Sequence, residues 1–187
     1  MTTMKSRVRV FNGFLGLPLF VLALLLAAGC ATSEERKRKK EESNLRIHVE
    51  SDASTDHSSA ISVIRAAPIR LNIEREAVLD ERHVESSLIV DQLGGFVVEL
   101  KLTRQGTWIM ERTTVVSRGR HLAIFSNFGE SRWLAAPLIT AKNSSGRITF
   151  TPDCTREEAE RFVRGLNNLT HKMERKENWP FSGPLDK

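Results

Sequence analysis

The side chains best suited to proton transfer in this sequence lie together between residues 80 and 85. Paired carboxylates near a histidine could exchange protons with a substrate, which is the basis of general acid and base catalysis. A cluster of this composition is also typical of a solvated turn, and that is the interpretation we adopt. The residues concerned are Asp80, Glu81, Arg82, His83 and Glu85.

Other patterns that carry catalysis are missing from the sequence. Gly94-Gly95 lacks the third glycine of a dinucleotide-binding loop, and neither a Walker loop nor a Gly-x-Ser-x-Gly nucleophile motif occurs. The histidines show neither the i, i+4 pairing nor the cysteine spacing of a metal site. We therefore predict a protein that is not an enzyme, with no catalytic residue, no metal ligand and no cofactor. The histidines are His48, His57, His83, His121 and His171.

Cys30 offers a different chemistry, because its thiol can be acylated. It follows three cations, Lys5, Arg7 and Arg9, and an apolar stretch over 14–28 that is too short for a spanning helix and ends in small residues. This order is typical of an export signal. We predict a signal peptide over 1–29 and a lipidated Cys30 at the start of the mature chain.

The residues Leu26-Ala27-Ala28-Gly29-Cys30 resemble the lipobox of bacterial lipoproteins. Ala27 stands where that family usually has a larger aliphatic residue, so the alternative is an ordinary secretory signal that leaves Cys30 as a free thiol. Ala31 is not the aspartate that resembles an inner-membrane retention signal. The resemblance implies attachment to a membrane through acylated Cys30, facing the periplasm, and it favours the outer membrane over the inner membrane.

Cys154 is the other cysteine, and it has no partner for an intramolecular disulfide if Cys30 is acylated. It lies just before a predicted helix, whose N-terminal dipole could lower the pKa of the thiol and make it redox-reactive. The alternative is a small residue in a turn. We prefer this alternative, because no second thiol could resolve an oxidised form.

The mature chain has almost no net charge. The full sequence has 28 basic and 23 acidic residues, and the signal peptide removes three basic residues and no acidic one. The mature charge is therefore 25 minus 23, or +2, which gives no support for binding nucleic acid. Residues 30–44 are highly charged without apolar periodicity and are predicted to be a disordered tether, and 176–187 an extended C-terminal tail.

Residues 45–175 are predicted to form one α+β domain. Apolar residues with a period of two, or in short continuous runs, predict strands. Helical periodicity marks a segment from near Gly106 to Gly119. The expected architecture is a mixed or antiparallel sheet with two helices packed on it. The predicted strands lie at 45–49, 61–64, 69–73, 88–90, 96–102, 122–125, 132–134, 136–139 and 147–150.

The second predicted helix begins after Thr155. Thr155 and Glu158 have the spacing of a capping box, in which each side chain bonds a free backbone N–H of the other residue. Apolar residues then recur at helical spacing and predict a face that covers the sheet. They are Ala159, Phe162, Val163, Leu166, Leu169 and Met173.

Five short segments follow one another between residues 95 and 170. They are Val97-Val98-Glu99-Leu100-Lys101-Leu102, Gly119-Arg120-His121-Leu122-Ala123-Ile124, Ala135-Ala136-Pro137-Leu138-Ile139, Gly146-Arg147-Ile148-Thr149-Phe150 and Thr155-Arg156-Glu157-Glu158-Ala159. Their combination resembles the head subdomain of the first periplasmic domain of the SecD preprotein translocase subunit. The resemblance covers under half of the chain, and it implies a compact α+β head that contacts unfolded polypeptide. It does not extend to the membrane motor of SecD.

The turn over 127–133 departs from the shorter Asp-Gly turn typical of that subdomain. We therefore place the candidate partner-binding residues there, namely Phe128, Arg132 and Trp133. Phe128 and Trp133 could instead be ordinary edge packing.

These observations lead to the hypothesis of a lipid-anchored envelope protein that binds a polypeptide or another envelope protein and assists protein export or periplasmic handling. One alternative is an envelope hydrolase or small-molecule carrier with its site in residues 45–91. Another is a structural lipoprotein without a ligand.

Overall fold

The computed structural model describes residues 33–52, 58–65 and 67–177. The chain divides into two compact units, Met1–Arg38 and Lys39–Lys187. In the first unit, residues 33–38 are helical, and Lys37 Nζ lies 3.7 Å from the Glu34 carboxylate. The sequence predicts no regular structure there, and this i, i+3 ion pair gives the helix local support.

The described part of Lys39–Lys187 contains nine strands, two α-helices and a 3-10 helix. In chain order these elements are β1 (Asn44–Val49), β2 (Ser58–Val63), β3 (Ile69–Glu74), β4 (Leu79–Asp80), η1 (Glu81–His83), β5 (Val84–Gln92), β6 (Gly95–Leu102), α2 (Arg104–Val116), β7 (Leu122–Asn127), β8 (Ser131–Ala135), β9 (Arg147–Phe150) and α3 (Arg156–Glu177).

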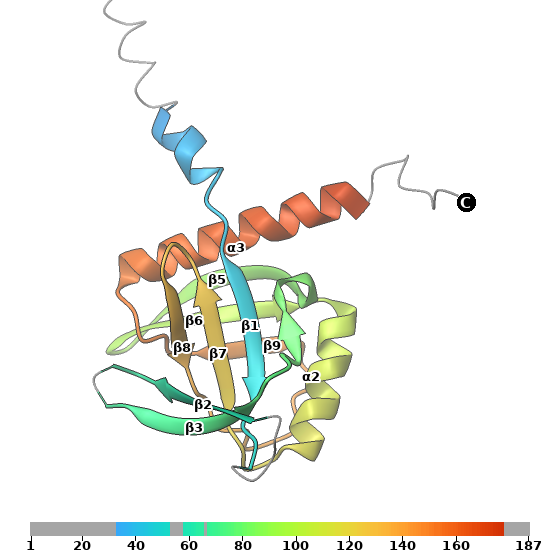
Figure 1. Ribbon diagram of the computed structural model, residues 1–187. Helices are drawn as coiled ribbons and strands as arrows, with labels where there is room; N and C mark the ends of the chain where they lie inside the picture. Colours follow the sequence, from blue (N-terminus) through green and yellow to red (C-terminus); the bar gives the residue numbers. More distant parts are fainter. Residues whose placement is uncertain (1–32, 53–57, 66, 178–187) are drawn as a thin grey trace, which may run out of the picture. The chain divides into compact units, whose positions relative to one another are not determined.

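The strands form three sheets, in which every pairing between named strands is antiparallel. Sheet A has the order β4-β1-β7-β8, sheet C has the order β5-β6-β9, and β2 pairs with β3 in the two-stranded sheet B. Figure 1 shows α3 along the top of these sheets and α2 at one side. The predicted α+β class is confirmed.

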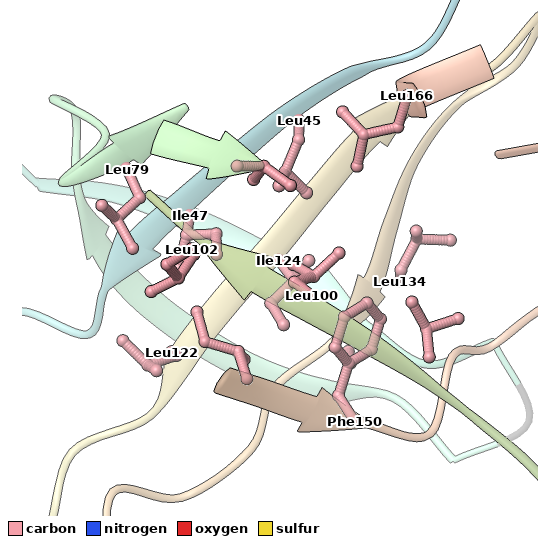
Figure 2. Close-up of a cluster of buried hydrophobic side chains, with 14 of the residues drawn as sticks. Leu45, Ile47, Leu79, Leu100, Leu102, Leu122, Ile124, Leu134, Phe150 and Leu166 are labelled. Atoms are coloured by element: carbon pink, nitrogen blue, oxygen red, sulfur yellow. The ribbon is translucent and has the colours of Figure 1, made fainter. Parts of the chain in front are cut away.

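The main core lies among sheet A, sheet C and α3. Leu45 and Ile47 of β1, Ile124 of β7 and Leu100 of β6 are fully buried and belong to one apolar cluster (Figure 2). The alternation predicted for residues 45–49 is confirmed, since its apolar side chains all point into this core. Burial of each large aliphatic side chain contributes about 1.5–3 kcal/mol.

The β2–β3 hairpin covers the opposite face of sheet A. Val63, Leu71 and Ile73 of the hairpin form a second apolar cluster with Ala123 of β7, and Trp133 packs at its margin. Side chains of neighbouring residues in a strand point to opposite faces, so Ala123 faces the hairpin while Ile124 faces the main core. Figure 1 shows the hairpin at the bottom of the view, where it crosses the strands of sheet A.

Helix α3 begins with the predicted capping box. The Thr155 N–H donates to the Glu158 carboxylate at 2.8 Å, and the Glu158 N–H donates to the Thr155 hydroxyl at 3.3 Å. Ala159, Phe162 and Leu166 are fully buried. The predicted apolar face of this helix is therefore the face that covers the core.

Residues 41–43, which the sequence places in the tether, lie against α3. The Arg164 guanidinium donates to the Glu41 carboxylate at 2.8 Å, and Ser43 is 1% exposed. The chain approaches α3 so closely at Gly165 that a Cβ atom there would lie 2.3 Å from the Ser43 hydroxyl oxygen. The folded domain thus includes these residues.

Helix α2 begins at Arg104, slightly before the predicted start near Gly106. Thr103 is its N-cap, and the Thr103 hydroxyl accepts the Gly106 N–H at 3.1 Å. Gly106 lies against η1, where a Cβ atom would be 2.5 Å from the His83 carbonyl oxygen. This close approach fixes which side of α2 faces the core.

The segment Ala136-Pro137-Leu138-Ile139 is not a strand, and the prediction of a strand there is wrong. It makes an isolated bridge between His121 and Leu138, and the Pro137 carbonyl accepts the Leu122 N–H at 2.9 Å. Pro137 has no N–H and so interrupts the ladder that β8 makes with β7, although Ile139 still exchanges backbone hydrogen bonds with Arg120 and Gly119.

Candidate functional site

Phe128, one of the predicted partner-binding residues, lies inside the protein. Its side chain is 4% exposed and packs edge-on against the ring of Phe162 in α3, with 6.3 Å between ring centroids. The turn between β7 and β8 folds inward, with Gly129 at a φ of 99° that favours glycine. Phe128 therefore stabilises the core instead of presenting an aromatic surface to a partner.

Arg132 is also buried, because it links β8 to the start of α3. Its guanidinium is 7% exposed, donates to the Glu158 carboxylate at 3.0 Å and pairs with Glu130. The hydrogen bonds from Arg132 and from the Thr155 N–H lower the pKa of Glu158 to about 2. The arginine is held by these carboxylates, so its charge is already matched within the domain.

Trp133 is the predicted site residue that lies at the surface. It is partly exposed on the outer face of sheet A, where its ring contacts Phe125 at 5.2 Å and His48 at 5.6 Å between centroids. Both contacts are edge-on arrangements, which aromatic pairs prefer. An aromatic surface exists near the predicted turn, but it belongs to the outer face of the sheet.

Strand β2 lies beside this aromatic surface and carries no charge. Its sequence is SSAISV, with Ile61 and Val63 turned toward sheet A and with Ala60 and Ser62 exposed. Strands β2 and β8 are neighbours in space. A surface strand without a charged residue is unusual, because charge on an edge is a common protection against pairing with other chains.

Only one side of β2 is paired within the described structure. The strand pairs with β3 along its whole length, from Ser58 opposite Glu74 to Val63 opposite Ile69. The far side of β3 is itself covered, since the Ser51 N–H donates to the Asn72 carbonyl at 2.7 Å. We call the unpaired side of residues 59–62 the open edge, because the next residue of β2, Val63, is only 1% exposed.

Other sheet edges are closed by side chains. On β5, the Asn167 amide accepts the Ser87 N–H at 2.8 Å and donates to the Ser87 carbonyl at 2.9 Å. On β9, Asn143 donates to the Arg147 carbonyl at 2.7 Å, and the Ser145 hydroxyl accepts the Arg147 N–H at 3.2 Å. These bonds occupy backbone groups to which another strand could add.

A loop partly closes the edge of β8, because the Asp153 N–H donates to the Leu134 carbonyl at 2.7 Å. Residues 59–62 make no comparable bond on their outer side within residues 33–52, 58–65 and 67–177. The open edge therefore differs from the edges of β5, β8 and β9. It can offer backbone N–H and C=O groups to an extended chain, next to the aromatic side chain of Trp133.

The acidic cluster at 80–85 has a structural role. Asp80 caps η1 by accepting the Arg82 N–H at 3.0 Å, and the Asp80 N–H donates to the His83 ring at 3.2 Å. Glu85 pairs with Lys101 on the neighbouring strand at 2.6 Å. The sequence predicts a solvated turn here, whereas the structure has η1 and the first residues of β5, and the side chains start η1 and pair β5 with β6.

Cys154 is partly buried, and this burial, together with the nearby Glu158 carboxylate, raises the pKa of the thiol to about 11. The N-terminal dipole of α3 does not overcome these effects. The thiol is thus protonated at neutral pH, as expected for a small residue in a turn.

Several predictions fall outside the described residues. The signal peptide, Cys30 and residues 178–187 of the predicted C-terminal tail are among them. The first two residues of that tail, Lys176 and Glu177, are not extended, because α3 continues to Glu177. Within the described ranges, no helix is long and apolar enough to cross a membrane, and no cluster of three or more possible metal ligands occurs.

Comparison with known proteins identifies the fold. No family model matches the chain, and no curated protein matches it. A solved structure described as SecDF, a membrane component that enhances protein export, has a TM-score of 0.53 and 16% identity over 73% of this chain and 67% of that chain. SecDF in a super-membrane-facing form gives the same TM-score and identity over 73% of this chain.

This chain spans 20% of that second SecDF chain. At 16% identity the likeness shows the fold, and it agrees with the SecD resemblance seen in the sequence. The domain is therefore a SecD-like α+β fold.

Proposed function

We propose that the protein is a lipid-anchored component of the cell envelope whose domain binds extended polypeptide at the open edge of β2. The open edge is the observation that carries this proposal. A chain that adds to a sheet edge forms main-chain hydrogen bonds, which do not depend on its sequence. Such binding suits a protein that meets many different exported chains and performs no chemistry on them.

The anchor is part of the same proposal and is supported by the sequence. The positively charged start, the apolar stretch and the small residues before Cys30 favour acylation of that cysteine. Attachment at Cys30 would hold the domain at the periplasmic face of a membrane, with the outer membrane favoured by Ala31.

The role in export is supported by the fold. SecDF is described as enhancing protein export, and its fold is similar to that of this domain. We infer that the domain assists the export or periplasmic handling of polypeptides by holding an extended segment beside Trp133.

The test is the binding of a fluorescently labelled, reduced and alkylated polypeptide to the full chain, measured by fluorescence anisotropy. Ala60→Lys places a charge on the exposed face of β2. A charge on an edge strand opposes the addition of another strand, and we expect about tenfold weaker binding, which is about 1.4 kcal/mol. Asn72→Lys is the matched control, because Asn72 lies directly opposite Ala60 on the covered strand β3.

The control should bind the polypeptide like the unchanged chain. Equal binding by Ala60→Lys, Asn72→Lys and the unchanged chain would show that polypeptide does not use the open edge. Thermal unfolding of the variants shows whether each has kept the fold.

A further inference from the structure

Helix α2 exposes three large apolar side chains to solvent. Its core side carries Ile109 and Met110 together with the small or polar residues Gly106 and Thr114. A helix at the surface of a globular protein ordinarily carries polar residues on its solvent side. The solvent side carries Trp108, Val115 and Val116, whose exposed fractions are 61%, 57% and 79%.

These side chains form one continuous surface. Together with Glu111 and Arg112 they line a shallow hollow of about 280 Å³ on the outside of the helix. The Arg112 guanidinium lies 5.8 Å from the centre of the Trp108 ring, so the cation and the aromatic ring face the same side.

Exposed cations lie along α2 and just beyond its C-terminal end. Arg104, Arg112 and Arg118 are exposed and form no ion pair within the described ranges. The acidic residue of the helix, Glu111, pairs with Lys142. The outward side of α2 thus combines a tryptophan, two valines and unmatched cations.

We propose that this side of α2 rests on an anionic lipid surface. A helix that lies in the membrane interface buries aromatic and aliphatic side chains at the level of the headgroups and pairs its cations with anionic lipids. An apolar polypeptide segment would account for Trp108 and the valines but would give no role to the three arginines. The lipid surface accounts for both.

The short segment between Cys30 and the domain allows even a weak contact between α2 and lipid to form. Glu41, which contacts α3, is 11 positions after Cys30, so an acylated Cys30 keeps the domain within about 40 Å of the bilayer. A tethered surface binds at a high effective concentration. This step rests on the anchoring proposed above, whereas the α2 surface is separate from the open edge of β2.

Tryptophan fluorescence tests the docking in the full chain reconstituted into vesicles through its anchor. The sequence has three tryptophans. Trp133→Phe with Trp179→Phe leaves Trp108 as the reporter, and Trp108→Phe with Trp179→Phe leaves Trp133 as the matched control. In vesicles that contain phosphatidylglycerol, lipids brominated near the carbonyl should quench Trp108 and leave Trp133 unquenched.

The arginines provide a second readout in the same vesicles. Replacement of Arg104, Arg112 and Arg118 by Gln should weaken docking about fivefold for each arginine. The quenching of Trp108 should therefore fall in these variants, and it should also fall in phosphatidylcholine vesicles or at high salt.

Three results would overturn the proposal. The first is equal quenching of Trp108 and Trp133. The second is quenching of Trp108 that stays the same when the arginines are replaced or phosphatidylglycerol is omitted. The third is an unquenched Trp108 in a chain that dimerises through α2. The comparison of two tryptophans in one anchored domain does not depend on polypeptide binding, so it can fail while the polypeptide assay succeeds. Fatty-acid labelling of Cys30 tests the anchor independently.

Discussion

At the scale of single residues, Arg132 was predicted to bind a partner, but its ion pair with Glu158 is a contact within the folded domain. Arg132 is a turn residue in the sequence, but its guanidinium is 7% exposed and bonds Glu158. Ion pairs between residues far apart in sequence leave no local pattern, so the sequence could not predict this contact. The exposed charge expected in the turn is instead an internal link between β8 and α3.

Glu158→Gln tests the stability that this link provides. We expect the free energy of unfolding to fall by about 2 kcal/mol at pH 7, because a buried guanidinium loses a charged partner. The native pKa of about 2 lies below the ordinary value of 4.5. The carboxylate therefore stabilises the fold fully above pH 4.5, and this contribution is lost as the pH falls toward 2.

Urea unfolding at several pH values measures the effect. Between pH 4.5 and 2, the free energy of unfolding of Glu158→Gln should fall by less than that of the unchanged chain. Glu157→Gln, at the exposed neighbouring position, should behave like the unchanged chain. Identical pH profiles for Glu158→Gln and the unchanged chain would contradict the assignment.

Cys154 provides a second test at this scale. A pKa of about 11, against an ordinary value of 9.0, leaves about a hundredfold less thiolate at pH 8. In the Cys30→Ser chain, where Cys154 is the remaining thiol, alkylation by iodoacetamide should be slower than after unfolding in urea by about this factor. Equal rates in the folded and unfolded chains would show that the thiol is not protected.

At the scale of elements, local patterns were reliable where short-range chemistry decides the structure. Thr155 and Glu158 predicted the start of α3, and the alternation at residues 45–49 predicted β1, because both patterns depend on residues a few positions apart. Pro137 should have signalled the absence of a strand, since it provides no N–H for a ladder.

The apolar stripe of α2 shows what periodicity cannot decide. Trp108 and Val115 have helical spacing, and the helix is present, but these two side chains face solvent while Met110 is buried. The close packing of Gly106 on the His83 carbonyl sets this orientation. Only the tertiary fold reveals such a contact, and the same is true of the open edge of β2.

Asn167→Ala tests the closure of the β5 edge. The substitution leaves the Ser87 N–H and C=O without their partner, which should lower the free energy of unfolding by about 2–3 kcal/mol. Arg161→Ala on the exposed side of α3 is the control and should change stability by less than about 0.5 kcal/mol. Chemical denaturation compares the two, and equal stability would mean that Asn167 does not protect this edge.

At the scale of the whole molecule, anchoring and binding are separate parts of the proposed function. Cys30→Ser should abolish the incorporation of labelled fatty acid and leave uncleaved or soluble precursor, because the acylated thiol is gone. Labelling that persists in this variant would contradict the anchor. Because the folded domain begins near Glu41, 11 positions after Cys30, it should unfold with the same midpoint in both forms.

The likeness to SecDF shows the fold, whereas the binding part of the proposal rests on the open edge of β2. The domain shares its architecture with SecDF at 16% identity. The open edge of β2, which would bind a polypeptide in our proposal, is visible in the structure of this domain. Of the residues predicted from the sequence, Trp133 lies beside the open edge, whereas Phe128 and Arg132 are buried.

Photocrosslinking in living cells tests the central claim most directly. A photoreactive amino acid at position 60 on β2 is compared with one at position 161 on the exposed side of α3, and captured proteins are identified by mass spectrometry. The account predicts that position 60 captures many unrelated exported chains and that position 161 does not. Equal capture from the two positions, or no exported chain at position 60, would contradict binding at the open edge.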